Sequence, residues 1–283
     1  MPKILATDLD GTLFFPKRRL IMIPRKNLEF LREFYDAGNK IVVVSGRNVN
    51  FAKKVEKKIG RPITFIGCNF AYVYEEGIIK CEKTFDGQKL LVFLESLIDK
   101  FEPISFVGMS KDENCVIRMF KYKLIYKILY PIYNLLQCSY RESYKIENSN
   151  FYASVLKNNM YKCMVMFGVS KQKVAYTSIV NKYLNTYDKF CEISWSGKAI
   201  ELTPTGASKS AGLSWYLKEH GYSEEDLYVV GDSGNDITMF KDFNKNSFCM
   251  EHGDPTVKKY AKHIIKNFND IKEYILNEKG KED

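Results

Sequence analysis

Residues 3–13 read Lys-Ile-Leu-Ala-Thr-Asp-Leu-Asp-Gly-Thr-Leu and join a short apolar run to an acidic turn. The run Lys3–Thr7 predicts a buried β-strand that ends in acid. Side chains two residues apart in an extended chain point the same way, so Asp8 and Asp10 are expected to face one site. Because two carboxylates this close repel each other, the pattern favours a divalent cation over an ordinary turn with surface acids. Gly11 allows the chain to turn sharply just past the strand.

The segments that follow alternate between helices and strands. Arg25–Ala37 carries apolar residues at helical spacing, and the glycine after it favours a helix end. Lys40–Ser45 is a continuous apolar run of the kind that is buried on both faces of a parallel sheet. Asn48–Ile59 predicts the next helix and Ile63–Ile66 the third strand. This order implies right-handed crossovers and a doubly wound parallel sheet.

The same alternation returns near the end of the chain. The late segments predict helices at Ser208–His220, Asn235–Phe243 and Asn269–Leu276, and strands at Leu227–Val230, Ser247–Met250 and His263–Ile265.

The middle of the chain, from about Thr84 to Lys198, is aromatic-rich and less regular. It predicts strands at Ile104–Met109, Cys115–Phe120, Tyr161–Gly168 and Cys191–Trp195, and helices at Leu90–Phe101 and Val174–Leu184. Four tyrosines have helical spacing and are expected to pack within this segment rather than to stack on a substrate: Tyr122, Tyr126, Tyr130 and Tyr133. We therefore expect an α/β fold with a doubly wound, Rossmann-like parallel-sheet core formed by residues 1–83 and 199–283, and an inserted α+β domain at residues 84–198.

Three further signals lie where predicted core strands end or a helix begins, which is where open parallel sheets place their ligands. In Val44-Ser45-Gly46-Arg47, the Ser45 hydroxyl and the following backbone N–H groups can hold an anion, although serine is also an ordinary helix cap. Lys209 stands in the first turn of a predicted helix, where the helix dipole disfavours a cation. A solvated lysine is the alternative there.

The last signal is Gly231-Asp232-Ser233-Gly234-Asn235-Asp236, directly after a predicted strand. Its carboxylates form an oxygen-rich cluster of the kind that suits Mg²⁺, which binds one or two carboxylates together with water and phosphate oxygens. An acidic turn that caps a helix is the alternative interpretation of this motif. Because a second acidic motif occurs at Asp8 and Asp10, a metal site shared by the two motifs explains them better than two separate turns do.

Composition restricts the remaining classes of protein. The 283 residues include 43 Lys and Arg against 34 Asp and Glu, a net charge of +9, and 45% are hydrophobic, which is typical of a globular protein. No uncharged run approaches the roughly 20 apolar residues of a membrane span, and the N-terminus does not have the pattern of a signal peptide.

The cysteines form no C-x-x-C pair and predict reduced thiols in a cytoplasmic protein. Because the basic residues are spread out, we expect an anionic metabolite as ligand rather than a nucleic acid.

In this order, the four signals resemble the haloacid dehalogenase (HAD) superfamily of phosphotransferases. Its pattern is D-x-D-G-T, then a strand-end Ser or Thr, then a Lys, then an acidic G-D-x-x-N-D cluster. The insert before Lys209 and the segment Ile200–Pro204 resemble the Cof-type phosphatase subfamily with a large α/β cap, and the resemblance covers the whole chain.

The resemblance implies a role for each matching residue. Asp8 is the expected nucleophile, and Asp10 the expected general acid and base. The implied metal is Mg²⁺, held by the carboxylates of Asp8 and Asp232 and the backbone carbonyl of Asp10, with Asp236 in the metal shell or bracing its loop. The implied substrate-binding residues are Ser45, Gly46, Arg47, Lys209 and Asn235.

The expected function is that of a cytoplasmic, Mg²⁺-dependent phosphatase that hydrolyses small phosphorylated metabolites, either sugar phosphates or phosphorylated cofactors, through an aspartyl-phosphate. A phosphosugar mutase on the same core is the alternative. A non-enzymatic phosphate-binding or regulatory module is less consistent with the sequence, because a receiver domain of roughly 120 residues leaves the insert unexplained. We expect no nucleic-acid or membrane partner, and the sequence leaves the substrate and a monomer or homodimer open.

Two local departures from the subfamily concern possible substrate contacts. Asn69-Phe70-Ala71 stands where many relatives have Asn-Gly-Ala, so Phe70 is expected to crowd the approach to the substrate and Asn69 is only a candidate contact. After the fourth motif relatives often have Met-Gly-Asn-Ala, whereas this chain has Met250-Glu251-His252-Gly253-Asp254, so His252 is either a local substrate contact or a histidine of a surface loop.

Overall fold

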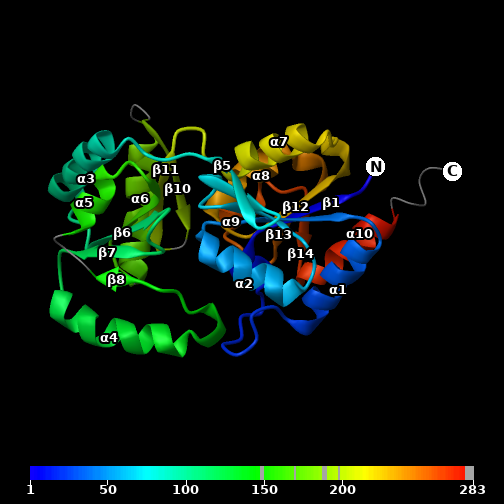
Figure 1. Cartoon of the computed structure of the whole chain (residues 1–283), viewed down its shortest axis with the longest axis horizontal. Coiled ribbons are helices and arrows are strands. Elements are labelled where there is room, and N and C mark those ends of the chain that lie inside the picture. Colours follow the sequence, from blue (N-terminus) through cyan, green and yellow to red (C-terminus); the bar gives the residue numbers. More distant parts are fainter. Residues whose placement is uncertain (147–149, 169, 187–189, 197, 278–283) are drawn as a thin grey trace.

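The computed structural model describes residues 1–146, 150–168, 170–186, 190–196 and 198–277. Two β-sheets, each covered by helices, lie side by side along the long axis of the molecule (Figure 1). The chain begins with a strand of one sheet, and its described part ends with a helix that covers the same sheet. Both ends lie at the end of the molecule farthest from the second sheet (Figure 1).

The larger sheet has eight strands in the order β14-β13-β12-β1-β2-β3-β4-β5. Its parallel strands are β1 (Ile4–Thr7), β2 (Lys40–Val44), β3 (Thr64–Gly67), β12 (Leu227–Gly231), β13 (Ser247–Met250) and β14 (His263–Ile265). Each of these overlaps a strand expected from the sequence. An antiparallel extension that the sequence did not predict follows at one edge, with β4 (Tyr72–Glu75) and β5 (Ile78–Glu82).

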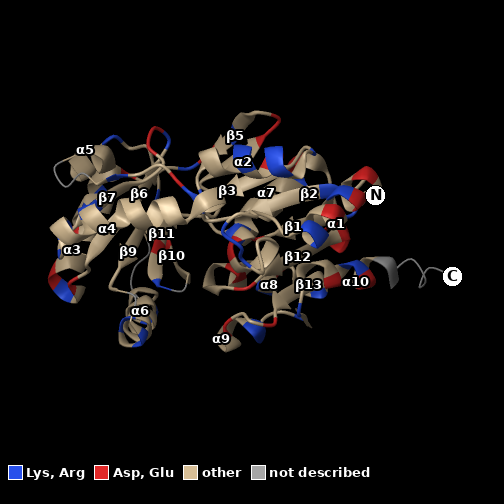
Figure 2. Ribbon diagram, turned by 90° about the horizontal axis from the view of Figure 1, so that it is seen from below, with Lys and Arg blue, Asp and Glu red and all other residues tan. Residues whose placement is uncertain are grey.

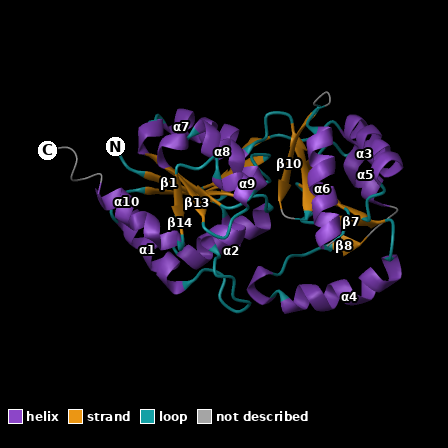
Figure 3. Cartoon of the chain, turned by 180° about the vertical axis from the view of Figure 1, so that it is seen from behind, coloured by secondary structure: helices purple, strands orange, loops and turns teal. Residues whose placement is uncertain are grey.

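Helices cover both faces of this sheet (Figure 3). They are α1 (Arg25–Asp36), α2 (Val49–Ile59), α7 (Lys209–His220), α8 (Ile237–Asp242), α9 (Pro255–Lys258) and α10 (Ile271–Asn277). Alternate residues of β1 enter different cores, because side chains of a strand point to opposite faces. Leu5 packs in the core with residues of α1, α2 and α10, whereas Ile4 and Ala6 pack in the core with residues of α7 and α8. The α/β fold predicted from the sequence is confirmed.

The second sheet has six strands in the order β10-β11-β9-β6-β7-β8. These are β6 (Ser105–Ser110), β7 (Val116–Met119), β8 (Lys145–Ile146), β9 (Met160–Met166), β10 (Cys191–Ser196) and β11 (Ala199–Pro204). Three helices pack with it in a third core: α3 (Gly87–Phe101), α5 (Asn150–Leu156) and α6 (Lys171–Leu184). The four strands predicted in this part of the chain all belong to this sheet.

The strand at residues 199–204 bears on where the insert ends. The prediction begins the second core segment at residue 199, but Ala199–Pro204 is β11, which hydrogen-bonds to β9 and β10 of the six-stranded sheet. An apolar run predicts a strand without showing which sheet it joins. We therefore propose that the inserted domain extends to Pro204, and residues 278–283 of the predicted core segment lie outside the described residues.

Helix α4 (Lys123–Leu136) contains no buried residue and lies apart from the other helices of the second sheet (Figure 1). Tyr126 and Tyr130 stack at 5.0 Å between ring centroids and pack against the apolar core, as the tyrosine spacing predicts. Tyr122 and Tyr133 are exposed, which corrects the expectation for these two. Among the helices in the described part of the chain, none is long and apolar enough to cross a membrane.

A buried ion pair in the second sheet also contacts the loops of the larger sheet. Lys162 of β9 and Glu201 of β11 are diagonal neighbours on one sheet face, with 2.8 Å between Nζ and Oε1 and side-chain exposures of 2% and 4%. Lys162 also donates to the Gly46 carbonyl of the larger sheet's loops at 3.1 Å, and Asn69 donates to Glu201 at 2.7 Å. Burial alone raises the pKa of Glu201, but the charge and hydrogen bond of Lys162 outweigh it and lower the pKa to about 2.

We predict that Glu201→Gln lowers the free energy of unfolding by about 3 kcal/mol, because it leaves the Lys162 ammonium buried without its carboxylate. Chemical denaturation at pH 7 measures this loss. The exposed Glu95→Gln on α3 is the matched control and is expected to change stability by less than about 0.5 kcal/mol. Since the folded pKa is depressed, the stabilisation is present above the ordinary Glu pKa of 4.5 and is lost as pH falls toward about 2. Equal stability of the two variants would show that the ion pair does not hold the sheets together.

Candidate functional site

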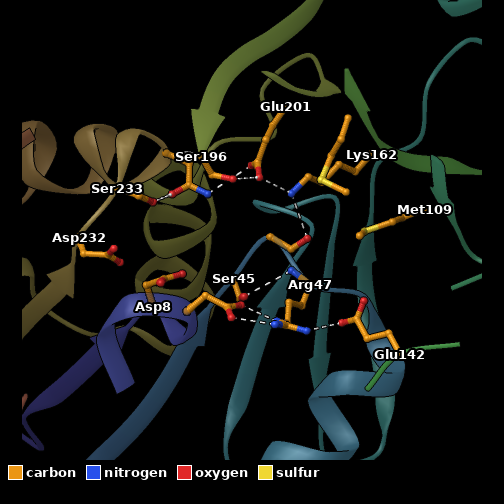
Figure 4. A pocket seen from close by; sticks show the side chains of 14 residues that line it. Asp8, Ser45, Arg47, Met109, Glu142, Lys162, Ser196, Glu201, Asp232 and Ser233 are labelled. Carbon is orange, nitrogen blue, oxygen red and sulfur yellow. Dashed lines mark hydrogen bonds and ion pairs between the residues drawn. The ribbon is translucent and has the colours of Figure 1, made fainter. Parts of the chain in front are cut away.

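The site lies at the carboxyl edge of the larger sheet, where the loops after β1, β2 and β12 meet the start of α7 (Figure 4). The backbone N–H of Asp8 donates to the Val230 carbonyl at 3.0 Å, which fixes the end of β1 beside the end of β12. Gly11 has a φ of +83°, and a Cβ built there lies 2.3 Å from Oδ2 of Asp232. Only glycine fits this turn, and it lets the first and last quarters of the chain meet.

Lys209 is the first residue of α7 and is almost fully buried. Its Nζ donates to Oδ1 of Asp8 at 2.7 Å and to Oδ1 of Asp236 at 2.6 Å. Burial alone lowers the pKa of Lys209, but the two carboxylates outweigh it and raise the pKa above its ordinary value. The unfavourable position in the helix dipole is therefore offset by two ion pairs, and the lysine stays charged.

Asp8, Asp232 and Asp236 each have a carboxylate oxygen within 4.8 Å of the others'. Oδ2 of Asp236 accepts from the backbone N–H groups of Asp232 and Ser233, both at 2.9 Å, so Asp236 holds the loop in place. Thr12 donates from Oγ1 to Oδ1 of Asp232 at 3.0 Å. These bonds fix the orientation of the acidic cluster before any ligand binds.

The cluster holds more negative than positive charge. Burial, together with repulsion from Asp236, raises the pKa of Asp8 to about 7 although Lys209 lowers it. Burial and then repulsion from Asp8 raise the pKa of Asp232 to about 8. One ammonium does not balance three carboxylates, and the donors are the hard oxygens that Mg²⁺ prefers. The residues present therefore fit a divalent cation between Asp8 and Asp232, since both oxygens of Asp236 are already engaged.

Asp10 points toward the second sheet and is held by Arg47. The guanidinium donates from Nε to Oδ2 at 2.5 Å and from Nη2 to Oδ1 at 2.7 Å, while its Nη1 donates to Oε1 of Glu142 at 2.6 Å. Burial alone raises the pKa of Asp10, but Arg47 outweighs it and holds the pKa below its ordinary value. Glu142 lies in the loop that follows α4 in the insert, so Arg47 links the predicted general acid to the insert (Figure 4).

A cavity of about 420 Å³ opens between the two sheets beside the acidic cluster. The larger sheet and its loops contribute Asp8, Asp10, Ser45, Gly46, Arg47, Asp232, Ser233 and Asn235, and the insert contributes Met109, Glu142, Lys162, Met164, Ser196 and Glu201. Lys209 and Asp236 lie deeper, behind Asp8. The fold thus brings all nine sequence-predicted site residues to one place.

Some predicted residues have partners that the sequence did not indicate. Asn235 donates from Nδ2 to Oε2 of Glu201 at 3.2 Å, so its amide contacts the insert. The Ser45 hydroxyl accepts from the backbone N–H of Arg47 at 3.3 Å. Gly46 has no room for a side chain, because a Cβ there lies 2.5 Å from Nζ of Lys162.

Sequence reasoning missed the residues that the insert contributes to the cavity. Lys162 and Glu201 each stand alone as charges inside an apolar strand, and that pattern is a signal for a buried, partnered charge. Ser196 donates to Glu201 at 2.8 Å at the end of β10. Glu142 lies in a loop, and no local pattern marks it.

The two departures from the subfamily pattern have structural explanations. Cys68, Asn69 and Phe70 all have positive φ, and Phe70 adopts 85°, a value that favours glycine. Its side chain is buried in the core with residues of α7 and lies near Trp215, so it does not crowd the cavity as the sequence suggested. His252 stacks on Phe15 with ring centroids 3.8 Å apart and is not among the residues that line the cavity.

Known proteins match the whole length of this chain. The family of haloacid dehalogenase-like hydrolases matches residues 5–273. A pyridoxal phosphate phosphatase of Escherichia coli (strain K12) is 21% identical over 280 residues, which cover 93% of each chain. A phosphoglycolate phosphatase of Methanoculleus marisnigri is 25% identical over 242 residues, which cover 85% of this chain and 81% of that protein.

Solved structures share the fold. A HAD/COF-like hydrolase from Plasmodium vivax has a TM-score of 0.76 at 22% identity and covers 98% of this chain and 96% of its own. A sugar phosphatase of HAD subclass IIB has a TM-score of 0.71 at 19% identity and covers 98% and 99%. With the match along residues 5–273 and the acidic cluster at the edge of the sheet, this chain belongs to the haloacid dehalogenase-like hydrolase family and is a hydrolase of the Cof type.

Proposed function

We propose that this chain is a Mg²⁺-dependent phosphatase of the cytoplasm that hydrolyses small phosphorylated metabolites through an aspartyl-phosphate on Asp8. The observation that carries the proposal is the meeting of Asp8, Asp232 and buried Lys209 at the floor of a cavity between the sheets. A carboxylate nucleophile, an oxygen-rich metal site and a fixed cation are what phosphoryl transfer requires.

The carboxylates of Asp8 and Asp232 and the backbone carbonyl of Asp10 would hold the metal, while Asp236 braces the loop. When bound, Mg²⁺ neutralises charge on the phosphoryl oxygens and on the attacking carboxylate. This neutralisation also keeps Asp8 ionised, although burial raises its pKa to about 7 in the metal-free protein.

The residues of the site divide the reaction into two steps. In the first, a carboxylate oxygen of Asp8 forms a bond to phosphorus while the bond to the leaving alkoxide breaks, and Asp10 gives its proton to that alkoxide. Ser45, the Gly46 N–H and Lys209 hold the phosphoryl oxygens. In the second, Asp10 takes a proton from water, whose oxygen attacks phosphorus and releases inorganic phosphate and free Asp8.

Arg47 affects both roles of Asp10. Its paired hydrogen bonds favour the ionised carboxylate, which is the form needed as base in the second step. To act as the acid in the first step, Asp10 must carry a proton, so the contact with Arg47 has to loosen when substrate enters. Glu142 holds the other side of the guanidinium and makes this change depend on the insert.

The leaving group is expected to be polar and rich in hydroxyl groups. The wall opposite Asp8 combines an ammonium, two carboxylates and a hydroxyl from Lys162, Glu142, Glu201 and Ser196, and these groups suit hydrogen bonds to several hydroxyls. Sugar phosphates and phosphorylated cofactors fit a cavity of about 420 Å³. The relatives named above as phosphatases of pyridoxal phosphate, of phosphoglycolate and of a sugar support this range.

A phosphate-release assay over a panel of phosphorylated sugars, cofactors and nucleotides tests the function. We predict hydrolysis with Mg²⁺ and a loss of at least about 10³-fold in kcat with Asp8→Asn, because the amide is not a nucleophile. The control is Asp242→Asn, an exposed aspartate of α8, which is expected to keep full activity. Full activity of Asp8→Asn would refute the nucleophile, and isomerisation of a hexose phosphate without phosphate release would assign a mutase instead.

We predict that Mg²⁺ alone raises the unfolding temperature of the wild-type protein by a few degrees. A ligand at about 100 times its Kd adds roughly 2.7 kcal/mol of stability. Asp232→Asn removes a metal ligand and is expected to abolish the increase, whereas Asp242→Asn is expected to retain it. An equal increase in both variants would mean that the cation binds elsewhere.

We predict that Arg47→Gln moves the acid limb of the kcat profile to higher pH, because the pKa of Asp10 rises once Arg47 no longer favours its ionised form. The acid limb of the kcat profile reports the pKa of Asp10, which must be ionised to act as the base of the second step. Lys53→Gln removes an exposed positive charge from α2 and controls for the effect of the protein's overall charge on the pKa of Asp10. If both variants have the wild-type profile, Arg47 does not set the ionisation of Asp10.

A further inference from the structure

Helix α4 exposes an apolar face that nothing else in the described structure covers. The outer face of α4 consists of Leu124, Ile125, Ile128, Leu129, Ile132, Leu135 and Leu136, whose exposed fractions lie between 47% and 73%. With 3.6 residues per turn these positions fall on one broad side of the helix, opposite Tyr126 and Tyr130, which pack inward. Contiguous apolar surfaces of this kind mark interaction sites, whereas scattered exposed residues do not.

The loop of residues 17–22 extends this surface past the end of α4. Ser139 donates from its backbone N–H and its hydroxyl to the Arg19 carbonyl at 3.2 and 2.9 Å. Tyr140 donates to the carbonyls of Ile21 and Met22. Leu20, at the tip of the loop, is 83% exposed. The loop and the helix therefore form one surface that joins the core sheet's loops to the insert.

Within the loop and the helix region themselves all the charges are basic, and Lys121 pairs with Glu102 outside these segments at 2.8 Å. Exposed cations occur on the loop and along the helix region, namely Lys17, Arg18, Arg19, Lys121, Lys123, Lys127 and Arg141. The sequence contains no Asp or Glu between Gly11 and Leu28 or between Lys121 and Arg141. Figure 2 shows α4 on the outside of the molecule with no acidic segment on it. We name this combination of the outer face of α4, the loop and these cations the α4 surface.

We propose that the α4 surface binds the surface of an anionic lipid bilayer. An apolar helix face whose opposite side and adjoining loop carry lysines and arginines lies in the plane of a membrane interface, with its leucines and isoleucines among the acyl chains and its cations reaching the headgroups. The helix is not a membrane span, so the contact is peripheral. This proposal revises the sequence-based expectation of no membrane partner, and it is independent of the proposed chemistry at Asp8.

Charge favours a bilayer over a second copy of this chain. A symmetric contact between two α4 surfaces would bring two sets of basic residues together without an acidic partner in either segment. A facing helix would also cover only a narrow seam of the broad apolar side. A bilayer that contains anionic lipid covers the whole side and supplies the opposite charge.

Flotation of the full-length chain with vesicles tests the proposal. We expect binding to vesicles of phosphatidylglycerol mixed with phosphatidylcholine, weak binding to phosphatidylcholine alone, and release at high salt. Ile128→Ser with Ile132→Ser is expected to reduce binding at least about tenfold, since both isoleucines lose the apolar area that they bury among the acyl chains. Lys123→Gln with Lys127→Gln is expected to weaken binding to the anionic vesicles selectively.

The matched control is Ile179→Ser on α6, because Ile179 is 64% exposed but lies outside the α4 surface. It is expected to bind like wild type, and thermal unfolding checks that every variant is folded. Failure of the wild type to float with anionic vesicles overturns the proposal, as does equal binding of the Ile128→Ser and Ile132→Ser variant. Light scattering that shows a dimer, converted to a monomer by the same two changes, assigns the surface to a second copy and overturns it as well.

Discussion

The ion pairs of Lys209 with Asp8 and Asp236 are the contacts on which the site depends. They join the end of the first strand, the start of α7 and the turn after β12, which come from opposite ends of the chain. Two buried carboxylates and a half-buried one, with a single ammonium, remain short of positive charge, and this shortage is the physical reason to propose a cation between Asp8 and Asp232. Gly11 makes the arrangement possible, since any side chain there would displace Asp232.

A second set of polar contacts ties the insert to this site. Glu201 and Lys162 bind partners in both sheets, and Arg47 connects Asp10 with Glu142. The insert therefore fixes groups that hold the loop of Ser45 and Gly46 and the proposed general acid Asp10.

The sequence was sufficient for the parts of the structure that depend on local patterns. Lys40–Ser45 and Leu227–Val230 predict their strands because continuous apolar runs are typical of buried parallel strands, and the polar residues at their carboxyl ends mark the ligand edge. The insert was harder. Ala199–Pro204 has the pattern of a strand, but pairing with β9 is a long-range choice that no local signal reveals. The partners of Arg47 and Asn235 could not be predicted for the same reason. Glu142 and Glu201 are far from them in the sequence and contact them only in the folded protein.

Chemical trapping of the covalent intermediate tests the central claim most directly. The wild-type enzyme is mixed with Mg²⁺ and a substrate that it hydrolyses. The reaction is quenched in acid during turnover, and the protein is digested for peptide mass spectrometry. The account predicts phosphate on the peptide that contains Asp8, and specifically on that side chain. Phosphate on another residue, or sustained turnover with no phosphorylated Asp8 under conditions that preserve acyl phosphates, would contradict it.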